Sequence, residues 1–259
     1  MPDDQTQERG LEQGALGVVR IVFLVLAAAT PLGAVVGPMA LGFALGNGPG
    51  MPGAYVLAGL VLLCFAAGYG AMSKHVTLAG AFYTYITQGL GRTAGLASAF
   101  VALVAYNAVF CSVIGAAGFF VREVVMQLTG WRGPWQLWSA LLLAAVAFLG
   151  RREVDVNAKI LGGLLLMEVG ILVALDVAIV AHRGLSAFSL TSFAPSTVFS
   201  GAAGAGLVFA FNCFIGFEAT AIFREEAKDP ERTVPRATYA AVCLIGVFYA
   251  LTAWALVSA

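Results

Sequence analysis

The chain has 259 residues, of which 60% are hydrophobic and only 11% are charged. An ordinary soluble domain carries roughly 25% charged residues, so this composition excludes a water-soluble fold. The 14 basic and 14 acidic residues cancel, and the net charge therefore indicates neither a nucleic-acid partner nor an acidic one. The four cysteines lie inside apolar segments, and we expect no disulfide, no metal site and no cofactor.

Long runs rich in Leu, Ala and Val predict transmembrane helices, because a helix needs about 20 apolar residues to cross the hydrocarbon core. About seven such runs follow a short N-terminal tail of residues 1–17, which predicts an all-α integral membrane protein. The third run is too long to cross upright and is expected to tilt or to extend beyond the lipid. The predicted spans are Val18–Gly46, Gly53–Ser73, Thr93–Gln127, Trp135–Gly150, Val156–Ala181, Thr197–Phe223 and Ala237–Ala259.

The basic residues set the expected orientation. With the N-terminus in the cytoplasm, eleven Lys and Arg lie in inner segments and three, Arg122, Arg132 and Arg183, lie outside. This positive-inside bias predicts a multi-pass protein of the plasma (inner) membrane with a cytoplasmic N-terminus. The last span ends at Ala259 without a polar flank and after an odd number of crossings, so we expect a truncated chain.

The first span contains a stretch rich in proline and glycine between Thr30 and Pro38. Pro31 and Pro38 each remove a backbone donor, and Gly33 relaxes the backbone. A continuous helix is therefore not expected through the middle of this span.

The sixth span repeats the theme with Asn212, Gly216 and Glu218, which place an amide, a flexible backbone and a carboxylate close together. Broken spans five helices apart, running in opposite directions, are the pattern of an inverted repeat with a substrate site between its halves. Unwinding frees amide donors for a carboxylate and carbonyl acceptors for an ammonium or a cation. The alternative is that these residues only kink or close-pack membrane helices.

Two loops carry a family resemblance. The segment Gly80 to Tyr85 with Gly89 to Arg92, and the later stretch Glu225 to Ala237, resemble loops of the amino acid-polyamine-organocation (APC) superfamily. Together with Phe211 to Glu218, in the right order and spacing, they extend the resemblance from Val18 to the end of the chain. The resemblance implies the LeuT-type fold, in which five helices are repeated upside down, here truncated to about seven helices.

This resemblance implies a permease, which is a secondary active transporter of amino acids or related small amines that works by alternating access and is coupled to protons. The transporter domain would cover residues 18–259, with the first repeat at about 18–182 and the start of the second at about 197–259. The implied partners are the small-molecule substrate, H+ or Na+, and the lipid bilayer, without nucleic acid. A sodium-coupled carrier of another small solute on the same fold stays open as an alternative.

The resemblance also places the substrate site at the two breaks. Gly33 and Ala34 match a glycine-rich segment of the family, whereas Val35 stands where a second glycine is usual. Basic-substrate exchangers carry a large aromatic residue where Asn212 stands, which argues against a bulky cation clamped by stacking. The predicted substrate-binding residues are Thr30, Leu32, Gly33, Ala34, Val35, Asn107, Phe211, Asn212, Cys213 and Ile215.

Carboxylates inside the membrane are costly unless they face a cavity, find a partner or are protonated. Glu168 lies within the fifth span, and Asp176 follows about two turns later. The resemblance places Glu168 at a position where some proton-coupled relatives carry a lysine. Glu168 is therefore the coupling candidate, either by exchanging a proton or by helping to bind a cation. The alternative is a protonated glutamate bonded to a neighbouring helix. Phe214 and Glu218 are the gate candidates, with core packing and bracing of the sixth span as their respective alternatives.

Other classes of protein fit the sequence less well. Two histidines, and no nucleophile paired with a base, do not indicate an enzyme. A seven-helix receptor has its N-terminus outside, opposite to the predicted orientation, and a retinal-binding protein would need a lysine in the last span, where none follows Lys228. The charged rings or repeated filter loops of a channel are not found.

Overall fold

Helices make up almost all of the regular structure, because a helix satisfies its own backbone hydrogen bonds where lipid offers none. The computed structural model describes residues 16–73, 76, 81–151 and 154–259, and most of the predicted tail and Gly80 lie outside this part. The longer helices are α1 (Val18–Ala28), α4 (Met51–Ser73), α5 (Ala81–Leu90), α6 (Arg92–Thr129), α7 (Trp135–Leu149), α8 (Val154–Arg183), α10 (Ala203–Asn212) and α11 (Pro230–Ser258). The short ones are α2 (Pro31–Ala34), α3 (Ala40–Leu45) and α9 (Pro195–Val198), with a π-helical turn at Val35–Met39 and 3-10 turns at Gly48–Gly50, Leu185–Ala187, Leu190–Phe193 and Phe217–Arg224.

Six segments of the described chain are long and apolar enough to cross a membrane, compared with about seven predicted. The first of them along the chain is the bent pair Val18–Ala28 and Pro31–Leu45, and the other five are single segments. The predicted span at Trp135–Gly150 differs, because α7 has 15 residues. At 1.5 Å per residue this helix is about 22 Å long, short of a hydrocarbon core of about 30 Å.

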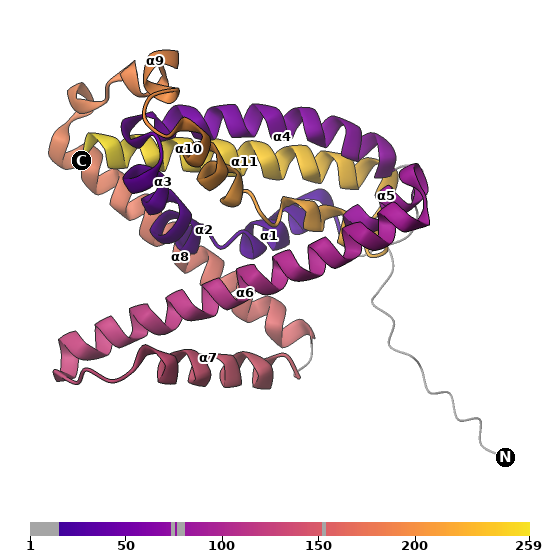
Figure 1. Ribbon diagram of the computed structural model, residues 1–259, viewed down its shortest axis with the longest axis horizontal. Helices are drawn as coiled ribbons and strands as arrows, with labels where there is room; N and C mark the ends of the chain where they lie inside the picture. Colours follow the sequence, from indigo (N-terminus) through magenta and orange to yellow (C-terminus); the bar gives the residue numbers. More distant parts are fainter. Residues whose placement is uncertain (1–15, 74–75, 77–80, 152–153) are drawn as a thin grey trace.

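The α6–α7 hairpin extends along one side of the molecule (Figure 1). With 38 residues, α6 is about 57 Å long and exceeds the thickness of a bilayer, in agreement with the predicted tilt or overhang. Helix α7 returns along it, and the two meet where Gly118 lies against Ser139. The Ser139 hydroxyl donates to the Ile114 carbonyl across this contact, at 3.1 Å.

The core lies where α4 and α11 run side by side and pack against the broken span Ala203–Arg224, which is the sixth of the predicted spans (Figure 1). Gly59 of α4 and Gly246 of α11 face each other, and the Phe214 ring lies against both of them. A Cβ atom added at these two glycines would contact the ring at 3.7 and 3.5 Å, so the small residues permit this close approach. Tyr55 and Tyr249 flank the same layer with ring centroids 5.8 Å apart.

Candidate functional site

The first break lies at Thr30, between α1 and α2. Thr30 has a left-handed backbone (φ 42°, ψ 71°), and the two parts of the span meet at a bend of 43°. Pro31 is the first residue of the second part, where its missing N–H costs no helical hydrogen bond. Beyond it the chain stays helical, because the π-helical turn accommodates Pro38. The predicted interruption is thus confirmed at Thr30, but not across the whole stretch to Pro38.

The second break lies at Gly216, as the composition of the sixth span predicts. Helix α10 ends at Asn212, residues 213–216 form turns, and the chain continues as the 3-10 helix Phe217–Arg224. Gly216 has φ 113°, a conformation that L side chains rarely adopt.

The two breaks meet in space. A Cβ atom added at Gly216 would lie 3.2 Å from the Ala29 nitrogen and 3.3 Å from the Ala28 carbonyl carbon, so the backbones pack directly together. The Cys213 thiol donates to the Ala34 carbonyl with a sulfur to oxygen distance of 3.7 Å. The Tyr249 hydroxyl reaches the Ala29 carbonyl at 3.5 Å. Segments almost 190 residues apart therefore form one polar centre inside an apolar bundle.

A carboxylate occupies one freed amide at each break. Glu168 of α8 accepts a hydrogen bond from the Leu32 N–H at 3.2 Å. Glu218 accepts one from the Gly216 N–H at 2.9 Å and another from the Tyr106 hydroxyl at 2.5 Å. Glu218 is 5% exposed; its side chain joins the break to α6, and its carbonyl accepts a hydrogen bond from the Tyr69 hydroxyl of α4 at 3.2 Å.

The predicted site residues differ in how far they are buried. Ala34, Val35 and Cys213 are buried at the breaks, as is Phe214, while Glu168 is half-buried. Asn107 is exposed and donates to the Leu103 carbonyl of its own helix, at 2.7 Å. Of the other predicted residues, Leu32, Phe211 and Ile215 are half-buried and Thr30, Gly33 and Asn212 are exposed.

Sequence reasoning missed the tyrosines around the breaks. Tyr55 shares a hydrogen bond with Cys213 at 3.1 Å, Tyr249 reaches the first break, and Tyr106 holds Glu218. The available signal was a phenol within an apolar span, since a buried hydroxyl usually finds a partner.

Replacement of Tyr106 by phenylalanine is expected to lower the free energy of unfolding by about 1.5 kcal/mol, because the Glu218 carboxylate loses a donor. Thermal unfolding in detergent measures this loss. Tyr83→Phe is the matched control, because Tyr83 is 47% exposed, close to the 48% of Tyr106, and its hydroxyl has no hydrogen-bond partner among the described residues. Equal effects of the two substitutions would show that the Tyr106 hydroxyl contributes nothing specific.

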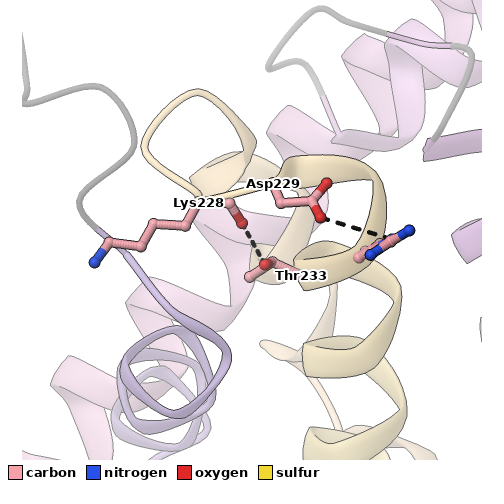
Figure 2. Close-up of polar contacts among 4 residues, drawn as sticks. Lys228, Asp229 and Thr233 are labelled. Atoms are coloured by element: carbon pink, nitrogen blue, oxygen red, sulfur yellow. Dashed lines mark hydrogen bonds and ion pairs between the residues drawn. The ribbon is translucent and has the colours of Figure 1, made fainter.

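The loop before α11 is held by local contacts that Figure 2 shows. The Thr233 hydroxyl donates to the Lys228 carbonyl, and Asp229 lies 3.7 Å from Arg232. The Lys228 N–H also donates to the Leu16 carbonyl at 2.8 Å, which ties the start of α1 to this loop. The buried Arg224 donates to the Ser73 carbonyl at the end of α4. These contacts join the loop to the start of α1 and to the end of α4.

These observations define a multi-pass membrane protein with a polar centre between two broken helices. Comparison with known families places the chain among amino acid permeases: the amino acid permease family matches residues 20–259, and the chain belongs to this family. The family and its relatives are transporters, not enzymes.

Several curated relatives are similar over much of the chain. The branched-chain amino acid permease BcaP of Lactococcus lactis subsp. cremoris is 28% identical over 94% of this chain and 54% of its own length. A probable GABA permease of Pseudomonas aeruginosa is 28% identical over 82% of this chain and 46% of its own. The low-affinity putrescine importer PlaP of Escherichia coli K12 is 25% identical over 77% of this chain and 44% of its own length. The chain thus spans about half the length of these relatives, and no solved structure gives a significant match.

Proposed function

We propose that the protein is a secondary active transporter of amino acids or related small amines. The observation that carries this proposal is the contact between the two helix breaks, where Gly216 packs on the backbone of Ala28 and Ala29. Paired broken helices near the middle of the membrane supply unpaired amides and carbonyls to a solute while the rest of the bundle stays helical. Relatives named for branched-chain amino acids, GABA and putrescine support this class of substrate.

The proposed fold is the LeuT type, with residues 18–182 as the first repeat and 197–259 as the start of the second. The proposed location is the plasma (inner) membrane, with a cytoplasmic N-terminus. The substrate binds between the broken first and sixth spans, near Ala34 and Cys213. The bundle that contains these spans then rocks against the remaining helices and opens the site to either side of the membrane.

Proton coupling through Glu168 is part of the proposal. Within the described residues Glu168 has no ion-pair partner, and a carboxylate in the membrane without a cation is costly. A proton on the Glu168 carboxylate removes that cost. When the proton leaves, the hydrogen bond from the Leu32 N–H becomes a stronger bond to a charged acceptor. The break and the coupling group are therefore in direct contact.

Uptake into proteoliposomes tests the proposal. A panel of labelled amino acids and amines is offered with an imposed proton gradient and, separately, with a sodium gradient. We expect uptake stimulated by the proton gradient and abolished by a protonophore. Stimulation by sodium alone would favour the sodium-coupled alternative, and an absence of uptake by well-folded protein across the panel would contradict the transport function.

A further inference from the structure

At the first break, one backbone donor is already bound and one backbone acceptor is only weakly bound. The Leu32 N–H is already bound by Glu168, and residue 31 is a proline, which has no N–H. The Ala29 carbonyl, in contrast, receives a long 3.5 Å hydrogen bond from Tyr249. The Ala29 carbonyl can therefore accept a stronger hydrogen bond from a solute that carries a donor.

The charge of the break points the same way. Glu168 lies on the face of α8 between Leu165 and Leu172, which are 4% and 1% exposed. The ion pairs in the described part of the chain, Arg122–Glu123 and Arg232–Asp229, leave this carboxylate without a cation. The second break carries another carboxylate, Glu218, that is likewise outside these pairs. Two carboxyl groups that belong to neither ion pair thus lie at the two breaks, in a medium of low dielectric constant where charges act strongly.

A zwitterionic substrate meets a conflict at this site. Its carboxylate would lie close to the carboxylate of Glu168, which already holds the Leu32 N–H, and two like charges at one site repel each other. An ammonium group instead neutralises Glu168 and donates to the Ala29 carbonyl without disturbing the existing hydrogen bond.

We propose that Glu168 is the specificity-determining residue of the substrate site and selects amines that carry an ammonium group and no carboxylate. This inference rests on the proposed transport function and narrows its substrate class. The Glu168 carboxylate takes the place that the carboxylate of an amino acid would occupy: it holds the Leu32 N–H and presents a negative charge to the bound amine.

Matched pairs of solutes that differ in a carboxylate test the inference. Propylamine is compared with 4-aminobutyrate, and 3-methylbutylamine with leucine, for uptake into proteoliposomes containing the whole protein. In the wild type we expect the amine of each pair to have a KM at least roughly tenfold lower than its partner. The comparison requires no variant and is independent of the folding of any mutant.

Glu168→Gln then tests the residue. The amide keeps an oxygen that accepts from the Leu32 N–H but carries no charge, so the preference for the amine is expected to fall by roughly tenfold or more. Asp176→Asn is the matched control. Asp176 lies two turns further along α8 and accepts a hydrogen bond from the Thr252 hydroxyl of α11 at 2.8 Å. Its replacement by asparagine removes a carboxylate from the same helix, but away from the break. The control is expected to keep the preference for the amine.

Each other outcome contradicts the inference in a distinct way. A wild type that prefers leucine and 4-aminobutyrate overturns the amine selectivity but leaves the transporter intact. An unchanged preference in folded Glu168→Gln, or an equal loss in Asp176→Asn, overturns the role of Glu168. Failure of every solute to enter or to bind overturns both the inference and the proposed function.

Discussion

Replacement of Phe214 by alanine is expected to destabilise the folded protein by about 3 kcal/mol or more. The Phe214 ring is 0% exposed and fills the space between Gly59 of α4 and Gly246 of α11. Loss of the ring leaves a cavity where two helices rely on close packing. The residues on either side are glycines, which have no side chain to fill it. Thermal unfolding in detergent and the yield of monodisperse protein measure the effect.

Phe199→Ala is the control for this prediction, because Phe199 is 62% exposed and its removal opens no internal cavity. We expect the control to change stability by less than about 1 kcal/mol. The same pair of variants separates packing from gating. If Phe214→Ala altered uptake while the unfolding temperature stayed at the wild-type value, Phe214 would be a gate and the packing argument would fail.

The second large effect is expected at Gly216. Replacement by alanine forces a side chain into a backbone conformation with φ 113°, which costs about 1–3 kcal/mol. The added Cβ atom would also lie 3.2 Å from the Ala29 nitrogen, so the backbone of the first span must shift by a few tenths of an ångström. Separation of the two breaks is expected to lower the rate of uptake per folded molecule by roughly tenfold or more.

Gly204→Ala is the matched control for Gly216→Ala. Gly204 lies on α10, has no atom within 4 Å of its added Cβ, and is helical, so alanine is tolerated there. Uptake is measured under an imposed proton gradient and normalised to folded protein. Wild-type uptake by Gly216→Ala would show that the contact between the breaks does not serve transport.

Local chemistry explains why the breaks could be predicted from sequence. A proline disfavours a helical conformation in the preceding residue, and the structure places the first break at Thr30, directly before Pro31. Glycine alone adopts φ 113° without strain, and the second break is at Gly216. Both signals act within a few residues, so they can be read without knowledge of the fold.

The partners of the site residues could not be predicted in this way. Asn107 was predicted to face the site, but Tyr106 is the residue of α6 that contacts Glu218. Adjacent residues of a helix differ by about 100° in direction, so the choice between them depends on how α6 is rotated against its neighbours. That rotation is set by packing between helices, which a single sequence does not display.

The sequence by itself determined that this protein is helical and embedded in a membrane, that its first and sixth spans are broken, and that carboxylates lie at membrane depth. Hydrophobic length, proline and glycine act locally, and each leaves a direct mark on the sequence. Only the tertiary structure decided that the two breaks touch and that Glu168 binds the Leu32 N–H, 136 residues away. Such contacts depend on which helix faces pack together, and packing is a property of the whole bundle rather than of any one segment.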